Sequence, residues 1–256
     1  MKDLFNIEGK VAVIIGGGGG IGRNIAEGFV QYGVKVVIAS RNLENLRKIA
    51  DEIGSAYNAE VTPLQVDITS EESVVRLKEQ VVSKYGTVDI LVNSQGYNVK
   101  SSAVDFPVKE WDTLFDVNVK GTMLTCREFG KVMIERKRGK IINISSVRGA
   151  RVTKWPGNLG YCTTKSAVDM ITRSLAAEWA PFNVNVNAIA PAWVDTGFSP
   201  SLRNSARLKT ALESIPLGRI ATPRDVVGVC IFLASPASDY ITGQVIYVDG
   251  GLTLVG

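Results

Sequence analysis

The chain has 256 residues, of which 25 are glycine, three are cysteine and none is histidine. This length is enough for a large buried core, and 45% hydrophobic with 21% charged residues are typical of globular proteins. Without histidine, a Ser-His-Asp or Cys-His catalytic apparatus and a histidine-ligated metal centre are excluded. Proton transfer near neutral pH must therefore fall to a tyrosine, a lysine, a cysteine or a carboxylate.

The charge balance and the cysteines narrow the class of protein further. The net charge is only +4, and the basic cluster at 136–140 is too short to indicate nucleic-acid binding. Cys126, Cys162 and Cys230 are odd in number and far apart, which argues against disulfides or a zinc site and favours a reducing compartment. No signal-peptide pattern or membrane-length apolar stretch is present. We therefore expect a cytoplasmic protein with no metal, no membrane span and no nucleic-acid partner.

Short apolar runs alternate with helical patterns along the whole chain, as in a parallel sheet that helices cover on both faces. We predict strands at 11–15, 34–39, 61–66, 88–92, 140–144, 184–190 and 244–248. We predict a helix that begins near residue 21, followed by helices at 43–53, 69–85, 108–117, 122–136, 161–180 and 223–234. A Thr69–Glu72 capping box is predicted to start the helix at 69–85. The sequence thus predicts one α/β domain over 1–256, a Rossmann-type doubly wound sheet of seven parallel strands. The long irregular segment at about 192–216 is predicted to be a substrate lid.

A glycine-rich loop joins the first predicted strand to the first predicted helix. Gly16, Gly20 and Gly22 stand at GxxxGxG spacing, which lets the backbone turn tightly and approach a pyrophosphate at the helix N-terminus. A glycine run alone indicates only a flexible turn. Its position inside a strand–loop–helix unit predicts dinucleotide binding.

The end of the second predicted strand bears on the choice of cofactor. An acidic residue there would bind the ribose 2′-hydroxyl of NAD, but this chain has Ser40 and Arg41. A hydroxyl and a guanidinium would hold a 2′-phosphate, so NADP(H) is favoured and NAD(H) is possible. The alternative is that Arg41 is an ordinary surface residue before a helix.

A candidate acid/base pair lies at the start of the long helix predicted at 161–180. Tyr161 and Lys165 are four residues apart and share a helix face, so we expect the ammonium to lower the pKa of the tyrosine hydroxyl. Ser146 follows the fifth predicted strand, at the sheet edge where α/β proteins bind ligands, and could orient a carbonyl. Either motif alone is weak, because a Tyr-xxx-Lys pair arises by chance and a serine there often caps a turn.

Taken together, these motifs resemble the short-chain dehydrogenase/reductase family over essentially the whole chain. The glycine loop matches the family's TGxxxGxG with Ile15 in place of Thr, residues 93–96 match NNAG with Ser94 and Gln95 departing, and residues 191–196 match PGxxxT with Ala192 in place of Gly. These departures bear on cofactor affinity rather than on the chemistry. The resemblance implies a catalytic tetrad of Asn118, Ser146, Tyr161 and Lys165. It implies cofactor contacts from Gly16, Gly20, Ile21, Gly22, Ser40, Arg41, Asp67, Ile68, Asn93, Gly96, Tyr161, Lys165, Pro191, Val194 and Thr196.

The resemblance also implies a mechanism, in which hydride passes between a nicotinamide and a carbonyl or alcohol carbon. Tyr161 would transfer the proton, Lys165 would lower the tyrosine pKa and bind the nicotinamide ribose, and Ser146 would position the substrate oxygen. Asn118 would hold a water that connects Lys165 to solvent. The family commonly forms tetramers, so a homo-oligomer, either tetramer or dimer, is expected.

The substrate is a small carbonyl or alcohol whose identity the sequence leaves open. The chain is similar to gluconate 5-dehydrogenases and related sugar-acid or polyol dehydrogenases, and the basic residues Arg148, Arg151 and Lys154 before Trp155 could meet a carboxylate or could be exposed loop charges. The main alternative is a 3-oxoacyl-(acyl-carrier-protein) reductase. Such enzymes dock an acidic carrier at two basic positions, of which one could be Lys137 but the other falls on Phe182. A further alternative is a non-catalytic NADP-binding regulator.

Overall fold

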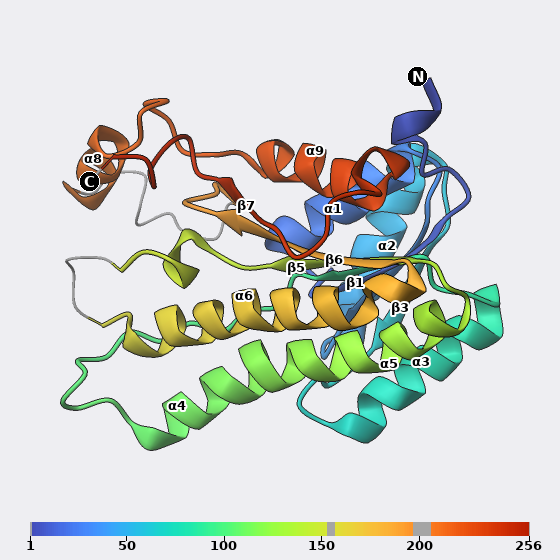
Figure 1. Ribbon diagram of the computed structural model, residues 1–256, viewed down its shortest axis with the longest axis horizontal. Coiled ribbons are helices and arrows are strands. Elements are labelled where there is room, and N and C mark those ends of the chain that lie inside the picture. Colours follow the sequence, from blue (N-terminus) through green and yellow to red (C-terminus); the bar gives the residue numbers. More distant parts are fainter. Residues whose placement is uncertain (1, 153–156, 197–205, 256) are drawn as a thin grey trace.

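A computed structural model describes residues 2–152, 157–196 and 206–255 of the chain. Its centre is a seven-stranded, all-parallel sheet with strand order β3-β2-β1-β4-β5-β6-β7, which confirms the predicted α/β fold (Figure 1). The strands are β1 (Val11–Ile15), β2 (Lys35–Ser40), β3 (Val61–Gln65), β4 (Ile90–Asn93), β5 (Gly139–Ile144), β6 (Val184–Pro191) and β7 (Val245–Val248).

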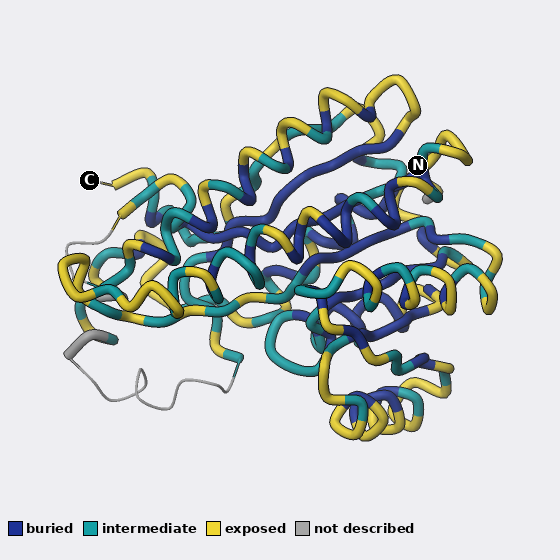
Figure 2. The backbone as a smooth tube through the Cα atoms, turned by 90° about the horizontal axis from the view of Figure 1, so that it is seen from below, coloured by how far each residue is buried: buried dark blue, intermediate teal, exposed yellow. Residues whose placement is uncertain are grey.

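Two layers of helices cover the sheet, one on each face (Figure 1). Alternate strand residues point to opposite faces, so Ile14 joins one core cluster and Val13 the other. The first cluster packs under α1 (Gly20–Gln31), α2 (Leu43–Tyr57) and α9 (Pro223–Ala234). The second packs under α3 (Glu71–Tyr85), α5 (Gly121–Glu135) and α6 (Leu159–Trp179). Because both faces are covered, the central strands are buried while the outer sides of the helices are exposed (Figure 2).

The strand order brings the predicted site residues to one edge of the sheet. The order reverses at β1, which pairs with β2 on one side and β4 on the other, and such a switch point leaves a crevice at the carboxyl ends of the strands. Ile15 of β1 is in register with Asn93 of β4, and Asn93 with Asn143 of β5. The glycine loop and the segments after β4 and β5 therefore meet at this edge.

The structure corrects several local predictions. The Thr69–Glu72 capping box is wrong, because Ser70 is the N-cap of α3 and its hydroxyl accepts the Ser73 N–H at 3.2 Å. Thr69 instead donates from its backbone and hydroxyl to Asp67 Oδ1. The α-helix predicted at 108–117 is shorter, since α4 covers only Val108–Phe115. A π-helical turn, η2 (Asp116–Lys120), follows it directly.

The predicted lid at 192–216 lies partly outside the described residues. Within it, α8 (Ala206–Glu213) is a helix where an irregular segment was expected. Short 3-10 helices complete the described chain at η1 (Lys2–Phe5), η3 (Val147–Gly149), η4 (Ala180–Phe182) and η5 (Pro236–Ser238). Among the described residues, no helix combines the length and apolar character needed to cross a membrane.

Candidate active site

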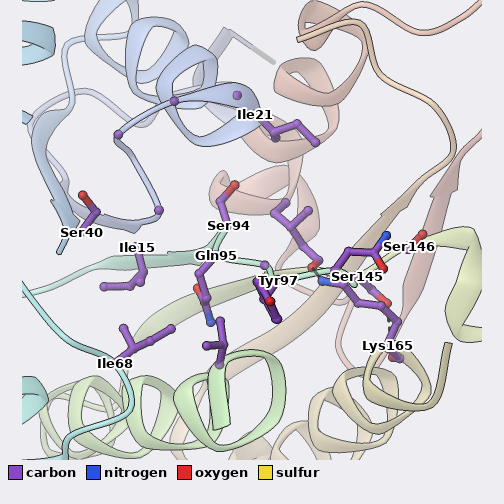
Figure 3. Close-up of a pocket in the computed structure, with 18 of the residues that line it drawn as sticks. Ile15, Ile21, Ser40, Ile68, Ser94, Gln95, Tyr97, Ser145, Ser146 and Lys165 are labelled. Carbon is purple, nitrogen blue, oxygen red and sulfur yellow. Dashed lines mark hydrogen bonds between the residues drawn. The ribbon is translucent and has the colours of Figure 1, made fainter. Parts of the chain in front are cut away.

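A cleft of about 700 Å³ lies at the carboxyl edge of the sheet, above the β1–β4 switch point. Figure 3 shows Ser40 at one end of it, Ser146 and Lys165 at the other, and Ser94 and Gln95 between them. The predicted cofactor residues that line this cleft are Gly16, Gly20, Ile21, Ser40, Arg41, Asp67, Ile68, Gly96, Tyr161, Lys165, Pro191 and Thr196.

Three predicted cofactor residues lie beside the cleft rather than on its lining. Val194 pairs with Ala221 in an isolated parallel bridge and packs against the core. Gly22 and Asn93 are buried beneath the loops that form the wall. Their structural roles follow from the residues they touch.

The glycine loop is shaped by close backbone contacts. Gly16 has φ of +79°, and a Cβ there would lie 2.8 Å from the backbone nitrogen of Gln95, so only glycine fits between β1 and the segment after β4. Gly22, on the first turn of α1, faces the Gly16 carbonyl group, and a Cβ would lie 2.9 Å from the carbonyl carbon. The GxxxGxG spacing therefore allows the helix N-terminus to pack directly on the loop.

Substitution of Gly22 tests this packing. Gly22→Ala is expected to displace the loop and to weaken NADPH binding about tenfold, because overpacking against rigid backbone costs about 1–3 kcal/mol. NADPH affinity is measured by fluorescence titration alongside thermal unfolding. The matched control is Gly228→Ala on α9, where a Cβ would meet nothing within 4 Å and stability should rise by up to about 1 kcal/mol. Unchanged NADPH affinity in Gly22→Ala would contradict this role for the glycine.

The Ser40 end of the cleft carries the residues predicted to select the cofactor. The Ser40 hydroxyl faces the glycine loop, 3.1 Å from where a Cβ on Gly18 would lie. Arg41 is exposed, borders the cleft and makes no ion pair with a described residue. Hydrogen bonds from Thr69 hold the pKa of Asp67 below its usual value, and Arg41 contributes to this. A free guanidinium at the cleft rim fits an anionic group such as a phosphate.

The opposite end holds the predicted acid/base residues. Ser146 follows β5, and its hydroxyl oxygen accepts the Arg148 N–H at 3.2 Å. Tyr161 and Lys165 lie on the first turns of α6, with the Lys165 Nζ 5.7 Å from the centroid of the Tyr161 ring. Lys165 is only 4% exposed, and its ammonium donates to the Ile144 carbonyl at 2.8 Å. The fold thus gathers Ser146, Tyr161 and Lys165 at one place.

The predicted lowering of the Tyr161 pKa by Lys165 is not what the structure shows. Burial raises the pKa of Tyr161, whereas a hydrogen bond with Ser146 and the Arg148 guanidinium lower it. The physical reason is that burial has the largest effect, and the Lys165 ammonium, which donates to the Ile144 carbonyl, is not among the groups that lower the Tyr161 pKa. Burial lowers the pKa of Lys165 to about 8, and the Asp169 carboxylate opposes that change. The pKa of Lys165 therefore lies closer to neutrality than that of an exposed lysine.

Asn118, the fourth residue of the predicted tetrad, is buried on the π-helical turn η2 and is not part of the cleft lining. Its amide accepts the Tyr97 N–H at 2.8 Å and donates to the Tyr97 carbonyl at 2.9 Å. It also donates to the Thr164 hydroxyl at 3.0 Å. Asn118 therefore ties the segment after β4 to the turn of α6 that carries Lys165. No motif in the sequence indicated Tyr97 or Thr164 as its partners.

Asn93 belongs to a buried network under the cleft. Its amide donates to Asn143 Oδ1 at 2.9 Å and accepts from the Thr125 hydroxyl at 2.8 Å, and Asn143 donates to Thr172 at 2.9 Å. These bonds join β4, β5, α5 and α6. The network therefore supports the cleft wall from beneath, because Asn93 does not line the cleft itself. The NNAG motif did not indicate this supporting role.

The four departures from the family motifs also line the cleft. They are Ile15, Ser94, Gln95 and Ala192. Gln95 donates from Nε2 to the Thr122 hydroxyl at 2.9 Å, and its Oε1 has no hydrogen-bond partner among the described residues. A buried acceptor without a hydrogen-bond partner therefore lies in the middle of the cleft wall, where the family motif has alanine.

Comparison with known proteins agrees with the fold. A family model described as enoyl-(acyl carrier protein) reductase matches residues 16–253. The chain belongs to the short-chain dehydrogenase/reductase family, whose members are oxidoreductases that act on CH–OH groups.

Its relatives differ in the substrates that their names state. A 2-dehydro-3-deoxy-D-gluconate 5-dehydrogenase of Dickeya dadantii (strain 3937) is 38% identical over 255 residues, covering 97% of each chain. A 3-oxoacyl-(acyl-carrier-protein) reductase of Thermotoga maritima is 37% identical over 250 residues, covering 98% of this chain and all of the relative. The crystal structure of a gluconate 5-dehydrogenase from Burkholderia cenocepacia J2315, in complex with NADP and tartrate, has a TM-score of 0.94 at 32% identity and 99% coverage of both chains.

Proposed function

We propose that this protein is an NADP(H)-preferring oxidoreductase that interconverts a ketone and a secondary alcohol on a sugar acid or polyol. The observation that carries the proposal is the single cleft that joins the glycine loop and Arg41 at one end to Ser146, Tyr161 and Lys165 at the other. The glycines Gly16, Gly18, Gly19 and Gly20 line the cleft at the N-terminus of α1, where a pyrophosphate would bind, so the residues present fit a dinucleotide. NAD(H) remains the alternative cofactor.

The side chains at the Ser146, Tyr161 and Lys165 end of the cleft each have a separate part in the proposed reaction. The bound nicotinamide supplies or accepts the hydride. During reduction the Tyr161 hydroxyl donates its proton to the carbonyl oxygen of the substrate, and during oxidation it takes that proton back. The Ser146 hydroxyl donates a hydrogen bond that orients the same oxygen. Lys165 holds a proton with a pKa of about 8 next to Tyr161, and Asn118 keeps the Lys165 turn of α6 in place.

Arg148 supports a substrate that carries a carboxylate. Its half-buried guanidinium donates to the Val152 carbonyl at 3.1 Å and lies 5.9 Å from the centroid of the Trp193 ring. No carboxylate among the described residues compensates the charge of Arg148. This charge lowers the pKa of the nearby Tyr161 hydroxyl. Arg151 instead donates to the carbonyl of Leu252 near the C-terminus. Lys154 and Trp155, the other residues predicted here, lie outside the described residues.

An Arg148→Gln variant tests this choice of substrate. For reduction of 5-keto-gluconate with NADPH, kcat/KM is expected to fall about 10- to 100-fold, since a charge-assisted hydrogen bond contributes about 1.5–3 kcal/mol. For a neutral keto-sugar the fall should be about threefold or less. Arg151→Gln, the same substitution three residues away, is the control and should leave the ratio between the two substrates unchanged. Equal losses for both substrates in Arg148→Gln would contradict carboxylate binding by Arg148.

A second candidate function is the reduction of 3-oxoacyl thioesters, which the 37% identical Thermotoga maritima relative favours. Lys137 is exposed after α5, but the second docking position is Phe182, a hydrophobic residue that is 38% exposed. An acidic carrier protein would therefore meet only one of the two basic docking positions on this chain. The same NADPH-oxidation assay with acetoacetyl thioesters decides, because faster turnover of these than of any sugar acid would select this function. Cofactor binding without any turnover would instead indicate a regulator.

We also propose that the protein is a cytoplasmic homo-oligomer, either a tetramer or a dimer. The described cysteines Cys126, Cys162 and Cys230 are free thiols, as expected in a reducing compartment. The helices α5 and α6 lie side by side on one face of the sheet and carry the exposed side chains Met123 and Met170 (Figure 1). Such apolar groups fit a subunit interface. Sedimentation analysis measures the oligomeric state.

A further inference from the structure

A buried carboxylate lies beneath the catalytic end of the cleft. Tyr161, Lys165 and Asp169 follow one another at intervals of four residues on α6, so they share one face of the helix. Asp169 is only 4% exposed, and its Oδ1 has no hydrogen-bond partner among the described residues. A buried and partly unsatisfied carboxylate is unfavourable, so its place next to Lys165 calls for a physical reason.

The segment that carries Ser146 packs directly on this carboxylate. Gly149 faces Asp169 Oδ2 so closely that a Cβ would overlap with it and would lie 3.2 Å from the Lys165 carbonyl oxygen. The Ser145 hydroxyl donates to the same carbonyl at 3.4 Å and lies close enough to Asp169 to lower the pKa of its carboxyl group. Ser166 donates to the Gly149 carbonyl at 2.6 Å. The loop on both sides of Ser146 is therefore attached to α6 around Asp169.

The charged groups around Asp169 come from two elements. Burial raises the pKa of Asp169, whereas the Ser145 hydrogen bond and the cations Arg173 and Lys165 of α6 lower it. The titratable Tyr247 of β7 is also influenced by this carboxylate, since burial and then Asp169 raise the pKa of its hydroxyl. Arg173 is exposed, so Lys165 is the buried cation of the group.

We propose that Asp169 is a positioning residue of the reaction, which keeps Lys165 in its ammonium form and holds the Ser146 segment against α6. The proposal rests on the catalytic roles given to Tyr161 and Lys165 above. An ammonium removed from water loses hydration, and a nearby buried carboxylate offsets that loss. Without the carboxylate, the charged form of Lys165 becomes less stable and its pKa falls below about 8. In the variant, Lys165 would then be largely neutral near pH 8, where about half of the Lys165 side chains of the wild type are still protonated.

The test is the pH dependence of carbonyl reduction in Asp169→Asn, which keeps the shape of the side chain and removes its charge. The alkaline limb of kcat/KM should move to lower pH by about one unit. That shift corresponds to about a fivefold loss at pH 8 and almost no loss at pH 6, because Lys165 is protonated in both proteins at the lower pH. Glu178→Gln, an exposed carboxylate-to-amide change on the same helix, is the matched control and should keep the wild-type profile.

A second variant covers the case in which Asp169→Asn does not fold. Asp169→Ser removes the same charge with a smaller side chain that does not have to fit against Gly149, so the alkaline limb should move to lower pH by the same amount. A wild-type pH profile in folded Asp169→Asn, or in Asp169→Ser when Asp169→Asn does not fold, would overturn the proposal and leave Asp169 a purely structural residue. If Tyr161→Phe retains activity, the proposed catalytic roles fail instead. If Tyr161→Phe is inactive while Asp169→Asn keeps the wild-type profile, only the role of Asp169 fails.

Discussion

Replacing Tyr161 with phenylalanine is expected to lower kcat for carbonyl reduction by about 10³-fold, since general acid catalysis contributes about 10²- to 10⁴-fold. The substitution removes one hydroxyl and keeps the ring that packs near Lys165. No histidine is present to take over the proton transfer. NADPH affinity should change by about twofold or less, because the loss falls on the transition state rather than on cofactor binding. Single-turnover kinetics and a fluorescence titration with NADPH measure the two quantities separately.

The control for this variant is Tyr240→Phe, which removes a hydroxyl from a fully exposed tyrosine. Its kcat should equal that of the wild type. Substantial residual turnover in Tyr161→Phe would mean that another group donates the proton. A parallel loss of NADPH affinity would mean that the hydroxyl holds the cofactor and not the reacting oxygen.

The cofactor preference should change most in Arg41→Asp. The guanidinium at the cleft rim is expected to form charge-assisted hydrogen bonds to the 2′-phosphate, which contribute about 1.5–3 kcal/mol, and a carboxylate in its place would repel that phosphate. We therefore expect kcat/KM for NADPH to fall about 10²-fold. The value for NADH should hold or rise, because a carboxylate can accept from a ribose 2′-hydroxyl. The measurement is the ratio of the two kcat/KM values in the variant and in the wild type.

Lys48→Asp is the matched control for the change of charge. Lys48 is exposed on the same helix that follows Arg41 and lines neither the cleft nor the cavity beside it. Solvent and salt screen its charge, so the cofactor ratio should stay within about threefold of the wild-type value. Equal cofactor ratios in Arg41→Asp and the wild type would remove Arg41 from the explanation of cofactor choice.

Strand and helix positions were readable from the sequence because burial imposes a periodic pattern. The apolar run at 11–15 is β1, and the amphipathic stretch at 223–234 is α9. The errors fell where a local choice depended on a neighbouring side chain. Thr69 binds the carboxylate of Asp67, which leaves Ser70 to cap α3. Similarly, Asn118 faces Tyr97 from a π-helical turn that a helical pattern does not distinguish from an α-helix.

The candidate site was predictable to the extent that its residues are close in sequence. Tyr161 and Lys165 share a helix face because four residues make about one turn. The bonds that hold Asn93 to Asn143 and Asn118 to Thr164 join residues 50 and 46 positions apart, and no spacing rule predicts them. The buried carboxylate of Asp169 also escaped notice, because only packing shows that Gly149 allows the loop to reach it.

The sequence by itself determined the fold class and the kind of chemistry, since strand patterns are local and the absence of histidine leaves tyrosine, lysine, cysteine and carboxylates as proton carriers. The proton affinities of those groups were decided only by the tertiary structure. Burial raises the pKa of Tyr161 and lowers that of Lys165 to about 8, while the Lys165 ammonium turns to a backbone carbonyl. The physical reason is that a pKa depends on which groups exclude water and which charges lie nearby, and distant parts of the chain supply both.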